Sequence, residues 1–181
     1  MHANKIERRK DAPTTHFVTF SCQDRKPWLA HPRVRDRIAE QLKRATERNA
    51  IELHAWVCMS NHMHLLATDA AQPVHSWLVE FKRRFAQHER KSLASELPAE
   101  AMSGQFWLHG GGVARDIWSW QEFVQKERYA HENPIRAGIC ERSIDWRWSS
   151  AYDAEVEQRA DMPVLSRPPE GLVDLLWWKA S

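Results

Sequence analysis

The chain has 181 residues, of which 43% are hydrophobic and 28% are charged, and its formal net charge is +2. This composition is typical of a globular protein with one main domain, and no run approaches the roughly 20 apolar residues of a membrane helix. The polar start of the chain lacks the apolar core of a secretory signal, and the three cysteines are odd in number and far apart. We therefore expect a soluble, cytoplasmic protein with no membrane partner.

The hydrophobic pattern predicts an alternation of strands and helices. Residues 15–22 are rich in β-branched and aromatic side chains, whereas the apolar residues of 33–49 recur at helical spacing. Residues 51–68 predict a hairpin that turns at Ser60 and Asn61. In chain order, the predicted elements are a strand over 15–22, a helix over 33–49, strands over 51–60 and 62–68, a helix from 74, a strand over 113–118 and a helix that begins after 119.

The order of these elements predicts the fold class. Strand, helix, strand, strand, helix, strand and helix indicate an α+β fold with a ferredoxin-like (RRM-like) antiparallel sheet covered by helices. Ser119 and Glu122 form a capping-box pattern at the start of the last helix, and Pro134 predicts its end near Asn133. Residues 94–112 lose periodicity and end in HGGG, which predicts a loop.

We expect three parts along the chain. A basic arm occupies residues 1–14, the main domain occupies 15–138, and a carboxy-terminal tail occupies 139–181. No internal repeat or low-complexity segment is visible.

His62 and His64 lie two residues apart at the start of the predicted strand 62–68. Alternate side chains of a strand share a face, so the two imidazoles project together and could bind one ion. Two ligands do not make a metal site, however, and strand histidines also pack in cores with their nitrogens hydrogen-bonded. Both interpretations stay open on this pattern alone.

Tyr129 lies in the last predicted helix, one turn before Asn133, so their side chains share a face. Tyr129 is well off the apolar stripe that contains Phe123, Val124 and Ala130. It is therefore not an obvious core residue, although a half-buried aromatic with a solvated hydroxyl would show the same pattern.

These segments resemble the single-tyrosine HUH transposases, and especially the REP-associated tyrosine transposases of bacteria. AWVCMSNHMHLL is similar to the segment that supplies the two metal-binding histidines of that family. RYAHENPIRAGI is similar to the segment with the nucleophilic tyrosine, four residues before a metal-binding polar residue. The motifs match His62, His64 and Asn133 as metal ligands and Tyr129 as the catalytic nucleophile.

The resemblance implies an HUH-type endonuclease fold and a metal-dependent endonuclease and strand transferase that acts on single-stranded or hairpin DNA. The tyrosine would form a 5′-phosphotyrosine intermediate at hairpin or palindromic DNA and rejoin strands without ATP, with Mg²⁺ or Mn²⁺ as cofactor. The family includes monomers and homodimers, and both states stay open. The chain departs from the family at Ser60, where proline is usual, and in HGGGVARD, where a bulkier segment is common.

The residue types suit this chemistry. A phosphodiester repels nucleophiles because its oxygens are charged, so the site must neutralise that charge and align the attacking group. Two neutral imidazoles and an amide oxygen leave coordination positions open for phosphate oxygens, although imidazole also suits Zn²⁺.

Two basic clusters are candidate contacts to the DNA backbone. One lies in the amino-terminal arm and the other on the predicted helix that begins at 74; the residues are Arg8, Arg9, Lys10, Lys82, Arg83 and Arg84. A run of charges can also simply solvate a face.

Ten tryptophans are many for a chain of this length. Trp56 and Trp77 lie on predicted core faces. The tail contains Trp146, Trp148, Trp177 and Trp178, whose rings would either stack unpaired bases or hold the tail on the domain.

Parts of the sequence are also typical of two other functions. HGGG resembles an oxyanion-hole motif of lipases and esterases, but no G-x-S-x-G occurs in the chain, which is also short for an α/β-hydrolase. A catalytically inactive nucleic-acid-binding module with the same fold remains the alternative, although the predicted strands lack the aromatic RNP signature. A covalent protein–DNA product would distinguish the enzyme from the binding module.

Overall fold

The computed structural model describes residues 15–110, 112–155, 162–163, 165–169 and 172. The predicted arm with Arg8, Arg9 and Lys10, and also Trp177 and Trp178, lie outside the described residues. The predicted division of the chain at residue 138 is not tested by the fold and stays a prediction.

The described residues contain four strands and five α-helices. The strands are β1 (Thr15–Ser21), β2 (Ile51–Cys58), β3 (His62–Asp69) and β4 (Val113–Ile117). The helices are α1 (Pro32–Glu47), α2 (Val74–Gln87), α3 (Ala99–Ser103), α4 (Trp120–Arg136) and α5 (Ser150–Glu155). Short 3-10 turns are η1 (Gln23–Arg25), η2 (Glu89–Leu93) and η3 (Ser143–Asp145). None of these helices has the length and apolar character needed to cross a membrane.

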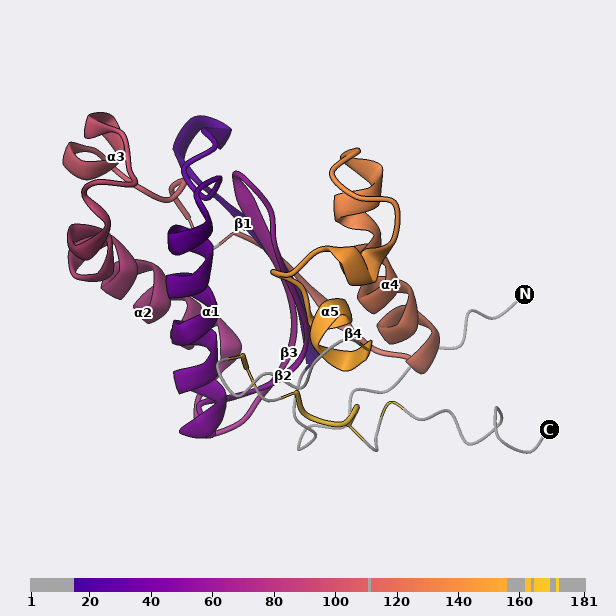
Figure 1. The fold of residues 1–181 in the computed structure, drawn as a ribbon. Helices are drawn as coiled ribbons and strands as arrows, with labels where there is room; N and C mark the ends of the chain where they lie inside the picture. Colours follow the sequence, from indigo (N-terminus) through magenta and orange to yellow (C-terminus); the bar gives the residue numbers. More distant parts are fainter. Residues whose placement is uncertain (1–14, 111, 156–161, 164, 170–171, 173–181) are drawn as a thin grey trace, which may run out of the picture.

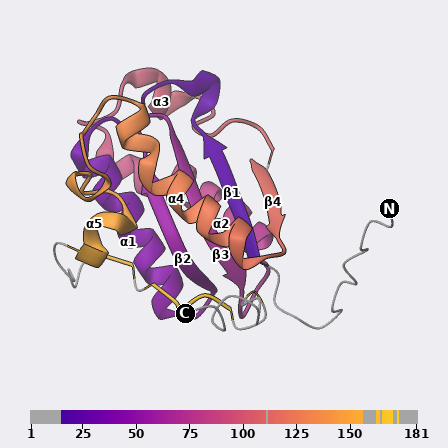
Figure 2. The same ribbon diagram turned by 90° about the vertical axis from the view of Figure 1, so that its right-hand side faces the viewer.

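The strands form one sheet in the order β2-β3-β1-β4, and all neighbouring pairs are antiparallel. Helices α1 and α2 cover one face of this sheet, and α4 crosses the other (Figure 1, Figure 2). The predicted α+β fold with a ferredoxin-like antiparallel sheet covered by helices is therefore confirmed. We call the two sides of the sheet the α1/α2 face and the α4 face.

Alternation along β3 divides the core between these faces, because successive strand side chains point in opposite directions. Met63 and Leu65 belong to the larger cluster, which the α1/α2 face shares with its two helices. Leu66 belongs to the smaller cluster under α4. Trp56 and Trp77 are buried in the larger cluster, as predicted.

The amino-terminal end of α4 follows the predicted capping pattern. The Ser119 hydroxyl accepts a hydrogen bond from the Glu122 backbone N–H at 3.1 Å, which satisfies one of the free donors of the first turn. The Glu122 carboxylate accepts from the backbone N–H of Trp118 at 3.0 Å, one residue before the cap. These two hydrogen bonds together fix the residue at which α4 begins.

The predicted end of this helix near Asn133 is wrong, because α4 continues through Pro134 to Arg136. Proline removes one intrahelical hydrogen bond, but the buried Pro134 leaves the following bonds intact. The helix ends in a Schellman-type turn around Gly138, whose φ is +67°; the N–H of Ile139 donates to the Pro134 carbonyl at 2.9 Å. This additional turn places Arg136 on the same side of α4 as Tyr129, and the Arg136 guanidinium lies over the Tyr129 ring.

The described part of the tail is attached to the domain through two tryptophans. The Trp146 indole N–H donates to the Cys58 carbonyl at 3.0 Å, and the Trp148 indole N–H donates to Asp36 at 2.9 Å. The Arg35 guanidinium carbon lies 4.7 Å from the centroid of each ring. For these two tryptophans, the contacts support the interpretation that the rings hold the tail on the domain.

The predicted loop over 94–112 contains the short helix α3, and Gly112 at its end lies close to β1. Gly112 has a φ of +87°, and a Cβ added there would lie 2.4 Å from the carbonyl oxygen of Thr19. Glycine is therefore required at this position for two reasons: the backbone of β1 leaves no room for a Cβ, and the positive φ is unfavourable for other residues.

We predict that Gly112→Ala lowers the free energy of unfolding more than Gly110→Ala does. Both glycines have a φ near +90°, at +87° and +89°, so alanine at either position costs about 1–3 kcal/mol in backbone strain. Only at Gly112 would the new Cβ also collide with β1, since nothing lies within 4 Å of the corresponding position at Gly110. Urea unfolding of the two variants measures the difference, and equal stability losses would contradict the prediction.

Candidate active site

Strand β3 and helix α4 bring the four residues of the predicted catalytic centre together. The ring centroids of His62 and His64 lie 4.8 Å apart, and those of His64 and Tyr129 lie 5.4 Å apart. The Asn133 side chain lies close enough to both imidazoles to raise the pKa of each, against the larger effect of burial. The assembly lies on the α4 face of the sheet, where α4 crosses β3 (Figure 2).

Asn61 fixes the orientation and the tautomer of His62. Its amide nitrogen donates to the Arg25 carbonyl at 3.0 Å, so its oxygen is the atom that lies 2.7 Å from Nδ1 of His62. An amide oxygen only accepts, so Nδ1 of His62 must carry the proton. Nε2 is then left with a lone pair, which is the state that a metal ligand requires.

His64 is held by the neighbouring strand. Its Nδ1 lies 2.7 Å from the Thr19 hydroxyl, and Nε2 is buried with no hydrogen-bond partner in the described part of the chain. Burial, together with repulsion from His62, lowers the pKa of His64 to about 3. Burial also lowers the pKa of His62, and the charge of Arg25 adds to that shift. Both imidazoles are therefore neutral near pH 7.

Asn133 offers a third donor atom. Its amide nitrogen donates to the Tyr129 carbonyl at 2.8 Å, which leaves the amide oxygen to face the imidazoles. The buried Nε2 of His64 has no hydrogen-bond partner in the described part of the chain. Such an atom lowers the stability of the fold unless a ligand binds it. Two neutral imidazoles and one amide oxygen fit a divalent cation with open coordination positions. Among the described residues, no group of three or more His, Cys, Asp and Glu side chains offers an alternative metal site.

Tyr129 lies at the edge of this centre and is 36% exposed. The Phe17 ring contacts it edge-on, with 5.9 Å between centroids. The Lys126 ammonium nitrogen lies 5.6 Å from the Tyr129 ring centroid, and the Arg136 guanidinium carbon lies 5.3 Å from it. The Tyr129 ring is thus next to two cations and to His64.

Several residues of this site were not identified from the sequence. They are the orienting groups Thr19 and Asn61 and the cations Lys126 and Arg136. A signal existed for the cations, because Lys126 and Arg136 recur with Tyr129 and Asn133 at spacings of three and four residues, which is one face of a helix.

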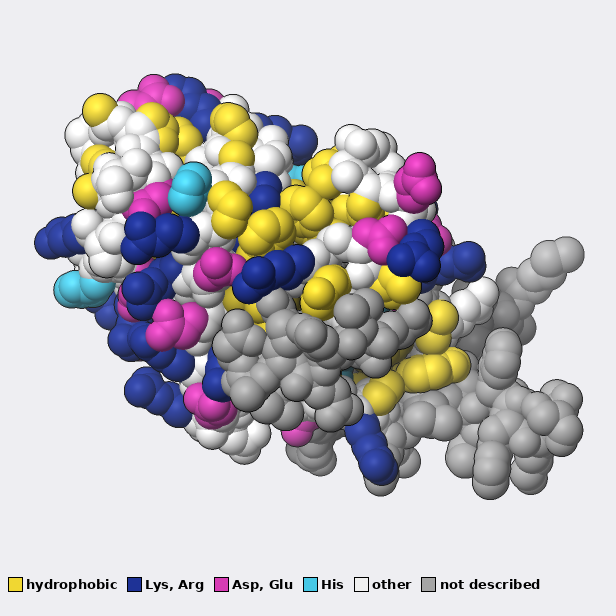
Figure 3. Space-filling model, viewed as in Figure 1, with side chains coloured by type: hydrophobic (Ala, Val, Ile, Leu, Met, Phe, Trp, Pro, Cys, Tyr) yellow, Lys and Arg dark blue, Asp and Glu magenta, His cyan; other side chains and the backbone are white. Residues whose placement is uncertain are grey.

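The predicted DNA contacts on α2 are not brought to this site. Lys82, Arg83 and Arg84 belong to the helix that covers the opposite face of the sheet. Lys82 donates to two backbone carbonyls of the loop before β4, at 3.1 and 2.6 Å, and Arg84 pairs with Glu89 at 3.5 Å. Figure 3 shows basic and acidic side chains mixed on the side of the molecule formed by α1 and α2.

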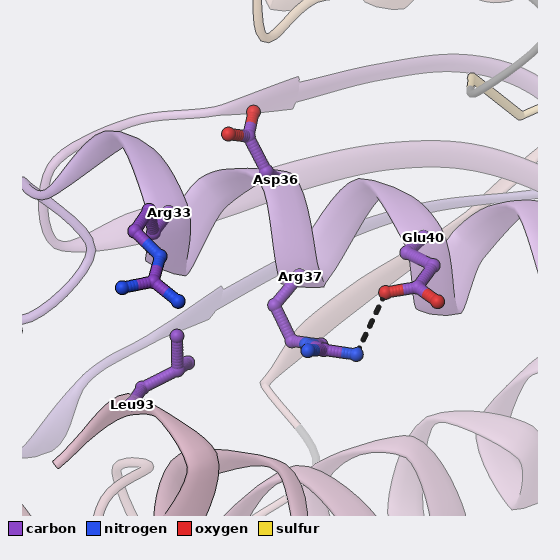
Figure 4. Close-up of a pocket in the computed structure, with 5 residues that line it drawn as sticks. All are labelled: Arg33, Asp36, Arg37, Glu40 and Leu93. Atoms are coloured by element: carbon purple, nitrogen blue, oxygen red, sulfur yellow. Dashed lines mark hydrogen bonds and ion pairs between the residues drawn. The ribbon is translucent and has the colours of Figure 1, made fainter.

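A hollow of about 290 Å³ also lies beside α1. It is lined by Arg33, Asp36, Arg37, Glu40 and Leu93 (Figure 4). Its cations are already neutralised, because Arg33 pairs with Glu96 and Arg37 pairs with Glu40. Unlike the centre under α4, this hollow has no tyrosine among the described residues that line it.

Comparison with known proteins gives an independent result. The family model described as "Transposase IS200 like" matches residues 11–114. This span includes both histidines of β3 and ends before α4. No curated protein matches the chain.

The chain is similar to several solved structures, among them the following two. A REP-associated tyrosine transposase bound to a REP hairpin has 18% sequence identity and a TM-score of 0.60, with 95% of this chain and 96% of that chain covered. A candidate transposase from Deinococcus radiodurans has 19% identity and a TM-score of 0.49, with 69% of this chain and 94% of that chain covered. At 18% identity the first of these likenesses establishes the fold.

We predict that His62 is a neutral imidazole protonated at Nδ1 at pH 7, because the Asn61 amide oxygen accepts a hydrogen bond from that N–H group. Long-range ¹⁵N–¹H correlation spectra of the imidazole distinguish the two tautomers directly. In Asn61→Ala the acceptor is lost, and the preference for Nδ1–H should weaken. A wild-type ring protonated at Nε2 would contradict the assignment.

Proposed function

Because the chain belongs to the IS200-like transposase family, we propose that it is a metal-dependent, single-stranded DNA endonuclease and strand transferase with Tyr129 as its nucleophile. The observation that carries this proposal is the convergence of His62, His64 and Asn133 beside Tyr129, although His64 and Tyr129 are 65 positions apart in the sequence. The family match ends before α4, so the proposal of Tyr129 as nucleophile is supported by the resemblance of its segment and by its position beside the histidines.

The proposed cofactor is Mg²⁺ or Mn²⁺, held by Nε2 of His62, Nε2 of His64 and the amide oxygen of Asn133. Such a cation, when bound, supplies Lewis-acid chemistry by withdrawing charge from phosphate oxygens. The protein prepares this site by keeping both imidazoles neutral and by fixing their Nδ1 atoms with Asn61 and Thr19.

Tyr129 performs the covalent step. Its hydroxyl oxygen forms a bond to phosphorus, the bond from phosphorus to the 3′ oxygen breaks, and the phenolic proton leaves as the 3′ oxygen gains one. The products are a 5′-phosphotyrosine and a free 3′-hydroxyl. In the reverse direction, a 3′-hydroxyl attacks the phosphotyrosine and restores a phosphodiester. The number of phosphoester bonds is unchanged, so rejoining needs no ATP.

The proposed substrate is single-stranded or hairpin DNA, in keeping with the solved transposase that is bound to a REP hairpin. The protein would act in the cytoplasm as a monomer or homodimer. The contacts proposed for Lys82, Arg83 and Arg84 require a DNA segment that reaches the α1/α2 face. A salt dependence of binding that is unchanged by charge reversal at Arg83 and Arg84 would exclude that path.

We predict that Tyr129→Phe abolishes covalent attachment to DNA while single-strand binding persists, because the change removes one oxygen and leaves the ring packing. A labelled pool of hairpin oligonucleotides with randomised single-stranded tails and Mn²⁺ supplies the substrate, and denaturing gels detect the adduct. Tyr152→Phe is the matched control and should retain the adduct. A wild-type chain that only shifts the DNA would support the inactive binding module, and an adduct in Tyr129→Phe would exclude this nucleophile.

We also predict that His62→Ala and His64→Ala lower both Mn²⁺ affinity and adduct formation by at least about 100-fold. Asn133→Ala should weaken Mn²⁺ binding less, by about 10-fold, since water can replace one oxygen ligand. Electron paramagnetic resonance titration measures free Mn²⁺ without relying on activity. His75→Ala, an exposed histidine of α2, is the control. Unchanged Mn²⁺ affinity in the β3 variants would remove the histidines from the site.

A further inference from the structure

Helix α4 presents one cation to the active site without a balancing carboxylate. The Lys126 ammonium nitrogen lies 5.3 Å from the Phe17 ring centroid and 5.6 Å from the Tyr129 ring centroid. Within the described part of the chain, it forms no ion pair with Asp or Glu. The nearby Glu122 feels the charge of Lys126, but its oxygens are bound by Arg115 and by a backbone N–H.

The other cation at the Tyr129 ring differs in this respect. Arg136 donates to Glu132 at 2.9 Å, and Arg128 binds the other oxygen of the same carboxylate at 2.8 Å. Arg136 thus has a carboxylate partner on its own helix, which it shares with Arg128, whereas Lys126 has none among the described residues and is available to an external anion.

The position of Lys126 is unfavourable until an anion arrives. Its ammonium nitrogen lies over the Phe17 ring, which itself stacks on His64, so its charge is close to the proposed metal ligands. A cation beside a centre built to hold a second cation is repelled by it. An anion placed between the two relieves this repulsion and is attracted by both.

A phosphate attacked by Tyr129 meets this condition. The phosphorus must lie next to the tyrosine hydroxyl, and the ring that carries this hydroxyl has His64 at 5.4 Å and the Lys126 nitrogen at 5.6 Å. The flexible four-carbon stem of lysine allows the ammonium group to move onto a phosphate oxygen.

We propose that Lys126 is a catalytic residue that binds a non-bridging oxygen of the phosphate attacked by Tyr129. This inference rests on the proposed function and adds to it a protein cation that acts together with the proposed metal ion. The ammonium group stabilises the negative charge that the phosphate oxygens carry through the transition state. No proton is transferred in this role, so arginine can replace lysine in part.

The first test compares rates of adduct formation at saturating hairpin oligonucleotide and Mn²⁺. Lys126→Ala should react about 100-fold more slowly than the wild type, as expected when one charge-stabilising donor is removed. Lys126→Arg should recover most of that loss. Lys91→Ala, an exposed lysine after α2, should react at the wild-type rate. A Lys126→Ala rate within about threefold of the wild type would overturn the proposal.

The second test measures the phosphate contact without chemistry, in the unreactive Tyr129→Phe chain. Each phosphate of the single-stranded tail is replaced in turn by an uncharged methylphosphonate, and binding is measured with and without Lys126→Ala. At one linkage, loss of charge should weaken binding several-fold when Lys126 is present and leave it unchanged when it is absent. Equal effects in both chains at every linkage would show that Lys126 only packs against Phe17.

The two proposals fail in different ways. A wild-type chain that forms no adduct would overturn the proposed function, while the binding comparison would still decide whether Lys126 contacts a phosphate. An active wild type with no coupling at any linkage would overturn the Lys126 assignment alone.

Discussion

The packing of Phe17 under α4 is the contact on which the catalytic centre depends. This β1 ring stacks on His64 with 5.4 Å between centroids and an interplanar angle of 16°, and it meets Tyr129 edge-on. One buried aromatic side chain therefore sets the distance between a proposed metal ligand on β3 and the proposed nucleophile on α4. Since β1 is a central strand that pairs with both β3 and β4, this contact is held from both sides of the sheet.

The same strand also fixes the chemistry of the histidines. Thr19 is paired with His64 across the ladder, so the threonine hydroxyl meets Nδ1 and leaves Nε2 for a ligand. At the other end of the centre, the amide of Asn61 is itself oriented by the Arg25 carbonyl. The two proposed histidine ligands are thus oriented by Thr19 and Asn61. Backbone hydrogen bonds in turn hold these two residues in place, which reduces the reorganisation needed when a cation binds.

The sequence predicted what depends on local periodicity. The alternation in 62–68 and the shared face of Tyr129 and Asn133 follow from one strand and one helix, and both are present in the structure. The sequence could not predict the roles of Thr19 and Phe17, because these roles depend on the register between strands that are more than 40 residues apart. The end of α4 was misplaced because a single lost hydrogen bond at Pro134 does not outweigh the favourable turn that follows.

Charge distribution separates the two faces of the sheet in a way that composition cannot reveal. On the α1/α2 face, Glu89 forms ion pairs with Arg37, Arg44 and Arg84, so much of the positive charge there is paired within the protein. On α4, Glu132 similarly binds two arginines, whereas Lys126 has no carboxylate partner among the described residues. A polyanion is attracted by charge that is not already paired. The small net charge of the chain is therefore compatible with a strong local attraction for phosphate at the place where Tyr129 is exposed.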